Sequence, residues 1–369
     1  MKVALACSGI GRVQRGYERF TTDLFSVIKN RENFTLFKSD GASTGTEKVL
    51  WSVSRDGLLR RVLPDSGVSR LQPYYFECLT FALSLLPHLV HGKYEIIHYI
   101  DPPLGNFLYR LRDNFKLGYK MIYTNGVGMS PRHYERPDHI HQMSQAHYQT
   151  ALDHGIPQTR MTMLPSGVNS SRLLSAAGKQ AVRRKYGVPE DAFVVLSVSA
   201  INRSHKRIDY LVQEIAALSN KCLLWVDGHP EDASILNLVA ERLGSNCRIT
   251  HVSSQSVGDL YQLADLFVLA SLEEGFGIAV VEAMYSGLPV LVHRNPHFMW
   301  LVGNEACLVD MEHEGNLATR IAQLMDHSSE LDVIARANAA KARRRFDWAY
   351  LKAEYVEMYR RLSSRQNSS

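Results

Sequence analysis

The sequence predicts two doubly wound α/β domains in tandem, each built on a parallel sheet. Short runs rich in β-branched residues alternate with longer helical patterns along the 369 residues, as they do in parallel sheets with crossover helices. The chain is long enough for two domains of roughly 100–200 residues each. Between two series of such runs, residues 164–172 read LPSGVNSSR. This content of Pro, Gly, Ser and Asn is typical of a linker.

Each expected element follows from a local pattern. Apolar runs bounded by turn residues predict first-domain strands at 2–7, 34–39, 94–100, 120–124, 139–144 and 160–164. The same pattern predicts second-domain strands at 193–199, 221–227, 248–252, 265–270 and 288–293. Helical periodicity predicts helices at 16–29, 104–114, 207–219 and 277–286, and a final amphipathic helix at 348–362. The expected domains are 1–165 and 172–345.

The most apolar segment, residues 74–90, predicts a helix that packs on the core or docks at the surface. Glu77, Pro87 and His88 interrupt it. No run reaches the roughly 18 apolar residues that a membrane span requires.

Composition narrows the function classes. The formal charge is +5, from 42 basic and 37 acidic residues, and no basic run interleaved with aromatics favours nucleic acid as a partner. The five cysteines are scattered and lack C-x-x-C spacing, which argues against a disulfide framework or a zinc site. Glycines interrupt the opening MKVALACSGIG too soon for a signal peptide. We therefore expect a cytoplasmic protein.

A glycine-rich loop follows the first expected strand. Gly9, Gly11 and Gly16 precede a helix, and such glycines let backbone amides approach a phosphate at the helix N-terminus. The G-x-G-x-x-G fingerprint of a dinucleotide-dependent oxidoreductase needs a glycine at position 14, where this chain has Gln14. That class is therefore disfavoured.

Two cations follow the first strand of the second domain. Arg203 and Lys206 lie in the loop between that strand and the next helix, where charge-assisted hydrogen bonds to a diphosphate are expected. A solvated pair at the surface is the alternative that this pattern leaves open.

The stretch SLEEGFGIAVVEAMYSG combines two carboxylates with a helix start. Glu274 lies at the end of a strand, and the amides of Phe276, Gly277 and Ile278 begin the next helix, where they favour an anionic group. Glu282 lies inside that apolar helix. A buried carboxylate needs a partner, and an ionised one accepts hydrogen bonds from hydroxyls such as a ribose diol.

Several motifs in order resemble the retaining GT-B glycosyltransferases of family four, the glycosyl transferases group 1. They are the glycine loop with GYERF, LPSGV, HKRIDYL, LYQLADLFVLAS, the E-x7-E pattern of EEGFGIAVVEAM with SGLPVLV, and FDWAYLKAEYVEMY. The resemblance covers nearly the whole chain. It implies a GT-B fold of two Rossmann-like domains with a cleft between them. The helix 348–364 would cross back onto the first, acceptor-binding domain, and 172–345 would bind the donor.

The resemblance also implies a role for each site residue. Arg203 and Lys206 would hold the donor diphosphate, backed by the loop of Gly9 and Gly11. Glu274 would bind hydroxyls of the donor sugar and Glu282 the nucleotide ribose, with the amides of 276–278 completing the cradle.

Two departures from the family pattern affect these expectations. The family's usual arginine lies five residues before its lysine, where this chain has Ile201, so Arg203 must substitute for it. Relatives often carry a histidine where this chain has Asn125, followed by Gly126. His98 is then the next candidate to contact the sugar or the acceptor, and a histidine satisfied at a strand end is the open alternative.

The implied reaction is the transfer of a hexose-type sugar from a UDP- or GDP-sugar to an acceptor hydroxyl, with retention and on one face of the sugar. No metal or other cofactor is expected, and no D-x-D pair follows a strand. The acceptor would be a glycan, a lipid-linked molecule or a small molecule. The arginines and aromatics of residues 54–76 suit contact with the acidic inner face of a membrane or with a lipid-linked acceptor, and a solvated loop is the open alternative. Another GT-B enzyme, such as a phosphorylase or a sugar-nucleotide epimerase, and an inactive nucleotide-sugar-binding protein remain alternatives.

Overall fold

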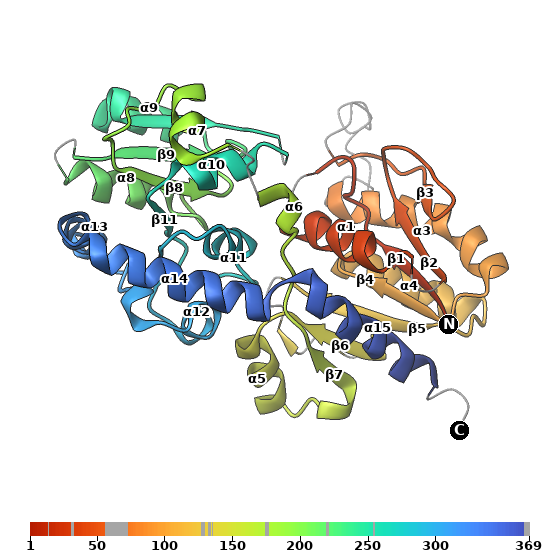
Figure 1. Ribbon diagram of the computed structural model, residues 1–369. Helices are drawn as coiled ribbons and strands as arrows, with labels where there is room; N and C mark the ends of the chain where they lie inside the picture. Colours follow the sequence, from red (N-terminus) through yellow and green to blue (C-terminus); the bar gives the residue numbers. More distant parts are fainter. Residues whose placement is uncertain are drawn as a thin grey trace. The chain divides into compact units, whose positions relative to one another are not determined.

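The chain forms two compact units in the computed structural model (Figure 1). Unit 1 is Met1–Gly167 together with the helix that begins at Trp348, and unit 2 is Val168–Asp347. The structure describes residues 1–13, 15–30, 33–55, 73–126, 130–131, 134, 136–173, 177–218, 221–253 and 255–364. Gln14 and most of the segment 54–76 expected to touch a membrane, residues 56–72, lie outside them.

Among the described residues, unit 1 contains a seven-stranded parallel sheet in the order β3-β2-β1-β4-β5-β6-β7. The strands are β1 Lys2–Ala6, β2 Asn33–Lys38, β3 Glu47–Val49, β4 Ile96–Tyr99, β5 Lys120–Asn125, β6 His139–Gln142 and β7 Met161–Met163. Six of them occupy the expected segments. The edge strand β3 was not expected, because it has three residues and no apolar run.

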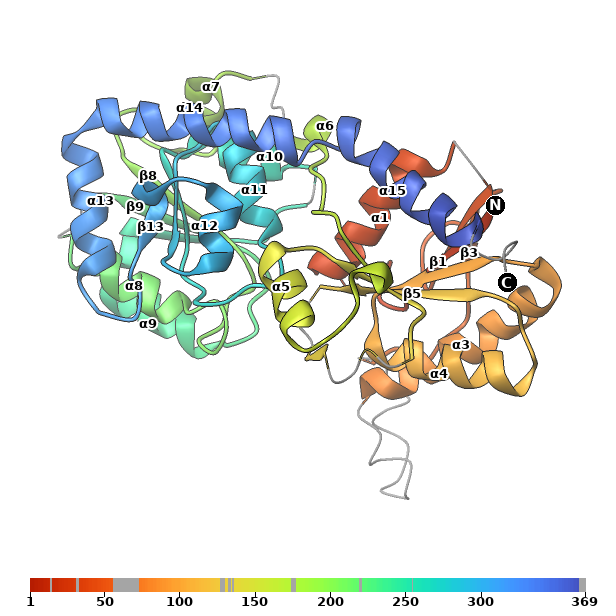
Figure 2. The same cartoon turned by 90° about the horizontal axis from the view of Figure 1, so that it is seen from below.

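The helices of unit 1 cover both faces of this sheet. They are α1 Gly16–Ile28, α3 Pro73–Gly92, α4 Pro102–Asn114, α5 Gln145–Asp153 and α15 Trp348–Ser364, with a 3₁₀ turn at Gln158–Arg160. Figure 2 shows α1 and α15 on one side of the sheet, and α3 and α4 on the other. The predicted apolar segment 74–90 is α3, which packs against α4.

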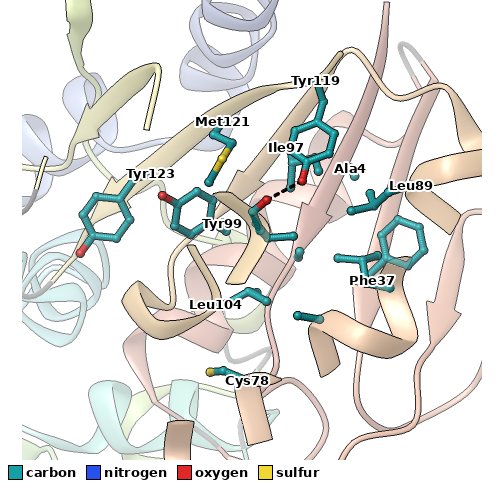
Figure 3. Packing of buried hydrophobic residues seen from close by; sticks show 14 of the residues in the cluster. Ala4, Phe37, Cys78, Leu89, Ile97, Tyr99, Leu104, Tyr119, Met121 and Tyr123 are labelled. Carbon is teal, nitrogen blue, oxygen red and sulfur yellow. Dashed lines mark hydrogen bonds between the residues drawn. The ribbon is translucent and has the colours of Figure 1, made fainter. Parts of the chain in front are cut away.

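The core of unit 1 lies between the sheet and the pair α3 and α4. Inward side chains from the helices, such as Phe81 and Leu104, meet Ile97, Met121 and Tyr99 from the strands, and all of these are buried (Figure 3). Burial of this apolar surface is the main favourable term in folding. One polar group that enters the cluster is satisfied there: the hydroxyl of the buried Tyr119 donates to the carbonyl of Leu108 at 2.7 Å.

The last helix, α15, completes the opposite face of the sheet. Two of its tyrosines meet a chain of buried polar groups on β4, β5 and β6. The Nδ1 atom of His98 is hydrogen-bonded to the Tyr359 hydroxyl at 2.6 Å, and its Nε2 atom to Thr124. The Thr124 hydroxyl also meets Nδ1 of His141 at 2.8 Å, and the Tyr355 hydroxyl is 3.2 Å from the other ring nitrogen of His141. The end of the chain is therefore part of the unit 1 core.

In the part of the chain that the structure describes, unit 2 contains a six-stranded parallel sheet in the order β10-β9-β8-β11-β12-β13. The strands are β8 Val194–Val198, β9 Leu223–Asp227, β10 Cys247–Thr250, β11 Leu266–Leu269, β12 Val290–His293 and β13 Leu308–Val309. Five match the expected runs, and the two-residue β13 was too short to recognise.

The helices of unit 2 also divide between the two faces of the sheet. α8 packs against α9 and α13, whereas α11 packs against α14. Their bounds are α6 Ser170–Leu173, α7 Lys179–Lys185, α8 Ile208–Ala216, α9 Ser234–Arg242, α10 Val257–Leu263, α11 Ile278–Tyr285, α12 Pro296–Val302, α13 Asn316–Asp326 and α14 Ser328–Arg345.

Each sheet is wound outward from its middle in both directions. In unit 1 the chain runs β1, β2, β3 toward one edge and β4 to β7 toward the other. In unit 2 it runs β8, β9, β10 and then β11 to β13. The point between β1 and β4, and that between β8 and β11, is a topological switch point, where ligands bind in open α/β sheets beyond the carboxyl ends of the strands. None of the described helices is long and apolar enough to cross a membrane.

The buried histidines under α15 predict that unit 1 loses stability in mild acid. Burial lowers the pKa of His98, and it lowers that of His141 from 6.5 to about 4. Above pH 6.5 the folded and unfolded chains are both neutral at these sites. As the pH falls from 6.5 toward 4, only the unfolded chain gains protons, so the stability that His141 contributes falls by roughly 3 kcal/mol. We expect the unfolding free energy, measured by urea titration across this window, to fall accordingly.

The matched variant is His141→Gln, which does not titrate and keeps polar atoms for Thr124 and the carbonyl of Leu164. It should lose stability at pH 7 but show a shallower pH dependence than the parent. An equally steep fall in the variant would remove His141 from the explanation.

Candidate functional site

The loop after β8 is held in one conformation by its own side chains. The Oδ1 atom of Asn202 accepts hydrogen bonds from the backbone amides of His205 at 3.0 Å and Lys206 at 2.8 Å. Arg207 adopts a left-handed backbone conformation with φ of 50°, and its Nη1 atom donates to the carbonyl of Met311 at 2.8 Å. Such a conformation costs free energy for a residue with a side chain, and here the anchored guanidinium holds it. The loop therefore presents Lys206 at a fixed place.

The loop after β11 is held by α12. The side-chain amide of Asn295 donates to the carbonyl of Leu272 at 2.7 Å, and Nε2 of His297 donates to the carbonyl of Phe276 at 3.1 Å. The Phe276 ring is buried between Trp300 and the C-terminal end of α14. This anchoring fixes the short segment that carries Glu274.

Lys206 and Glu274 form an ion pair at the switch point of unit 2. The Nζ atom of Lys206 contacts Oε1 of Glu274, and the two side chains are only 19% and 10% exposed. One comes from the loop after β8 and the other from the loop after β11, which are neighbouring strands in the sheet. An ion pair with so little access to water interacts more strongly than one at the surface. Two of the expected site residues are thus brought together.

The helix α11 begins beside this pair. Gly277, its N-cap residue, has φ of 91°, and a Cβ atom there would lie 3.1 Å from Cδ2 of Leu301. No side chain caps the helix, so the amides at its start, including that of Ile278, keep their capacity for an anion. Glycine is needed at 277 because its backbone is left-handed.

Glu282 is buried inside α11, with 1% of its surface exposed. The Tyr261 hydroxyl, from α10, donates a hydrogen bond to its Oε2 atom at 3.0 Å. This contact partly explains how a carboxylate is accommodated in an apolar helix, since a buried charge requires hydrogen-bond donors. Tyr261 escaped the sequence reasoning, because nothing in LYQLAD marks its hydroxyl as the partner of a residue 21 positions later.

Arg203 does not join the pair of Lys206 and Glu274. Its Nε atom lies 3.3 Å from Asp232 and donates to the Ser234 hydroxyl at 3.1 Å, at the start of α9. A second carboxylate, Asp209, is 3.8 Å from its Nη1 atom. Two carboxylates therefore compete for this guanidinium, and the geometry does not support the expectation that Arg203 and Lys206 grip one diphosphate together.

The ends of β9 and β10 meet next to the loop after β8. The buried Asp227 carboxylate accepts hydrogen bonds from the Thr250 hydroxyl at 2.7 Å and from the amide of Val252 at 2.9 Å. Burial raises the pKa of this carboxyl. Beyond it, the rings of His229 and His251 meet edge to face, with centroids 5.9 Å apart. These two imidazoles together form an aromatic surface at the same carboxyl edge of the sheet.

In unit 1, the glycines after β1 form a tight turn. The carbonyl of Gly9 accepts hydrogen bonds from the amides of Arg12 at 3.1 Å and Val13 at 2.9 Å. Gly11 has φ of 90°, and a Cβ atom there would meet the backbone of Asp40 at 2.7 Å. Gly11 is therefore required by the turn itself, whatever it binds, whereas a side chain at position 9 would meet the Glu18 carboxylate.

His98 and Asn125 are buried in the interior of unit 1, and Gly126 is partly exposed after β5. Both ring nitrogens of His98 are hydrogen-bonded under α15, so it is the satisfied histidine that the sequence left as an alternative. Asn125 donates to the Tyr134 hydroxyl at 2.6 Å and to Gln142 at 2.9 Å. Gly126 lies against the Tyr17 ring. The expectation that His98 contacts a sugar is corrected by this geometry, because the imidazole has no remaining nitrogen to offer.

Three comparisons place the chain among known proteins. Residues 178–343 match the family model of the glycosyl transferases group 1. Mannosylfructose-phosphate synthase of Agrobacterium fabrum is 28% identical over 214 residues, which cover 53% of this chain and 46% of that protein. The chain thus spans about half the length of the curated relatives it matches.

Solved structures resemble the chain over almost its full length. Sucrose-phosphate synthase from Thermosynechococcus elongatus has a TM-score of 0.82 at 17% identity, covering 98% of this chain and 99% of that one. Anabaena Alr3699/HepE, in complex with UDP and glucose, has a TM-score of 0.77 at 16% identity, covering 97% and 99%. At this identity the likeness shows the fold. Residues 178–343 of unit 2 therefore belong to the glycosyl transferases group 1, and the two sheets have the GT-B fold.

Proposed function

We propose that the chain is a retaining glycosyltransferase that moves a hexose-type sugar from a nucleotide-sugar to an acceptor hydroxyl. The observation that carries this proposal is the ion pair of Lys206 and Glu274 at the switch point of unit 2. It places a cation suited to phosphate beside a carboxylate suited to sugar hydroxyls. The family of residues 178–343 supports the same reaction class.

In this proposal unit 2 binds the donor. Lys206 and the amides at the start of α11 hold the diphosphate, Glu274 accepts hydrogen bonds from the sugar, and Glu282 accepts them from the ribose. The base lies toward His229 and His251. A UDP- or GDP-sugar is the expected donor, and the HepE complex with UDP and glucose supports this choice. Arg203 contributes to binding the diphosphate only if it leaves Asp232. Lys206 therefore has the larger role in that binding.

Unit 1 binds the acceptor at the carboxyl edge of its sheet, and we expect a sugar unit that is free or part of a glycan or lipid-linked molecule. The loop of Gly9 and Gly11 borders this edge. Its turn leaves Gly9 too crowded for a side chain, so contacts there would come from the backbone.

We propose that transfer proceeds on one face of the sugar. As the bond to the leaving phosphate lengthens, negative charge grows on the phosphate oxygens, and the Lys206 ammonium and the α11 amides stabilise it. The departing phosphate can then take the proton of the acceptor hydroxyl. Neither metal nor other cofactor has a step in this scheme.

Replacing Lys206 by Ala should lower kcat by roughly 10²–10³-fold, because its charge acts most strongly as the phosphate departs. Release of nucleoside diphosphate from UDP- and GDP-sugars, with and without an acceptor mixture, measures this. The control is Lys185→Ala, which removes a lysine paired with Asp259 at the surface of the same unit and should keep the parent rate. Equal rates for parent and Lys206→Ala would end the proposed role, and no nucleotide release from the parent would argue for a binding protein.

Replacing Glu282 by Gln should weaken binding of UDP or GDP by roughly 1.5–3 kcal/mol, the weight of hydrogen bonds to a charged group. Binding of inorganic pyrophosphate, which lacks a ribose, should not change. Calorimetry with both probes separates the two effects. Glu214→Gln is the control, because that buried carboxylate serves the amides of Gly315 and Ala318 at the start of α13. Parallel losses for both probes would indicate a structural role for Glu282.

Activity should survive dialysis against EDTA, because the proposed charge stabilisation comes from Lys206 and backbone amides. The measurement is nucleotide release before and after chelation, and again after Mg²⁺ is added back. A loss that Mg²⁺ restores would contradict the metal-independent scheme.

A further inference from the structure

The switch point of unit 1 carries a buried carboxylate that is fully satisfied. Asp101, directly after β4, accepts hydrogen bonds from the amide of Ser8 at 3.0 Å and from the Tyr74 hydroxyl at 2.6 Å. Ser8 follows β1, the neighbouring strand. These bonds tie together the loops after the two central strands of the sheet and the start of α3. Asp101 thus holds these segments together at the carboxyl edge of the sheet.

A second carboxylate at this edge is buried but not satisfied. Glu18, in the first turn of α1, is 4% exposed. Its Oε1 atom lies 3.4 Å from Arg15 and fills the space where a Cβ atom of residue 9 would be, at 2.1 Å. Its Oε2 atom is buried, and among the described residues it has no hydrogen-bond partner. An unpaired buried carboxylate oxygen is costly, and burial accordingly raises the pKa of Glu18.

Two further buried hydroxyls lack partners in the described chain, those of Tyr17, next to Glu18 on α1, and of Tyr123 on β5. Burial raises the pKa of Tyr17, and so do the charges of Asp101 and Glu18. The Tyr17 ring lies against Gly126, directly after β5, the strand that carries Tyr123. Burial and the adjacent Tyr17 raise the pKa of Tyr123. Figure 3 shows Tyr123 at the end of the core cluster, with its hydroxyl directed away from Tyr99.

We propose that Glu18, Tyr17 and Tyr123 form an acceptor subsite that binds hydroxyl groups of an uncharged sugar or polyol unit and excludes a phosphorylated one. Glu18 accepts a hydrogen bond from one ligand hydroxyl through Oε2, and the tyrosine hydroxyls bond to others. The inference rests on the proposed function and specifies the class of its acceptor.

The subsite excludes anions because the nearby arginines are already bound to other groups of the protein. Arg55 binds Glu77 through its backbone amide, Nε and Nη2 at 3.0, 3.1 and 2.6 Å. Arg12 donates to the side chain and carbonyl of Ser52 at 2.9 and 3.0 Å. These cations are engaged, and Arg15 is paired with Oε1 of Glu18, whereas the buried Oε2 atom of Glu18 lacks a hydrogen-bond donor among the described residues. A phosphate placed here would meet like charge with little solvent to screen it, but a neutral hydroxyl group supplies the missing proton donor.

The test measures equilibrium binding of matched probes to the full chain by ligand-observed NMR. The probes are D-fructose against D-fructose 6-phosphate, and myo-inositol against myo-inositol 1-phosphate. For at least one pair, we expect the parent to bind the neutral member about tenfold or more tightly. Glu18→Gln, which keeps shape but loses the charge, should weaken the neutral member and reduce the ratio. Tyr17→Phe should weaken the neutral member without changing the discrimination.

The control is Glu95→Gln, which removes a carboxylate at the opposite edge of the same sheet, where Glu95 accepts from the amide of Lys2. It should bind all probes as the parent does. The proposal is overturned if the phosphorylated members bind the parent as tightly as the neutral ones, if no neutral probe binds, or if Glu18→Gln matches the parent. Binding of UDP and GDP, measured in parallel, reports on the proposed function alone, so its failure is distinguishable from that of the subsite.

Discussion

The two-directional winding of each parallel sheet is the constraint from which both sites arise. Right-handed crossovers send the chain to opposite faces on the two sides of the sheet's middle, so the loops after β1 and β4, and those after β8 and β11, turn away from each other. Backbone and side-chain groups at that edge are not covered by a helix of their own and must find partners. In unit 2 they do so through Lys206 and Glu274, and in unit 1 through Ser8 and Asp101.

The same topology carries opposite chemistry in the two units. At the switch point of unit 2 a lysine and a helix start, both positive, face a carboxylate, which suits a ligand with an anionic and a hydroxylated part. At the switch point of unit 1, the Oε2 atom of Glu18 and the hydroxyls of Tyr17 and Tyr123 have no hydrogen-bond partner among the described residues. Two sheets of the same winding thus carry different sites through a few residues near each switch point.

The sequence predicted what depends on local pattern and missed what depends on distant partners. Eleven expected strands lie where apolar runs are bounded by turns, but β3 and β13 are too short to carry a pattern. Lys206 and Glu274 were each recognised from their place in a loop after a strand, but their ion pair was not predicted. The sequence could not predict the hydrogen bond between His98 and Tyr359 or the ion pair between Arg203 and Asp232. Nor could it identify Glu18, whose importance lies in a missing partner that only the packed structure reveals.

Unit 1 also depends on residues that are far away along the chain. His98 and Tyr359 are hydrogen-bonded across 261 positions, and His141 and Tyr355 across 214. Without α15, ring nitrogens of His98 and His141 would lose hydrogen-bond partners, at a cost of about 1–3 kcal/mol for each group left unsatisfied. The carboxyl ends of these strands carry Asp101 and Gly126, next to Tyr17 and Glu18. The helix α15 therefore stabilises the strands that carry this edge, although it contributes no side chain to that edge among those described.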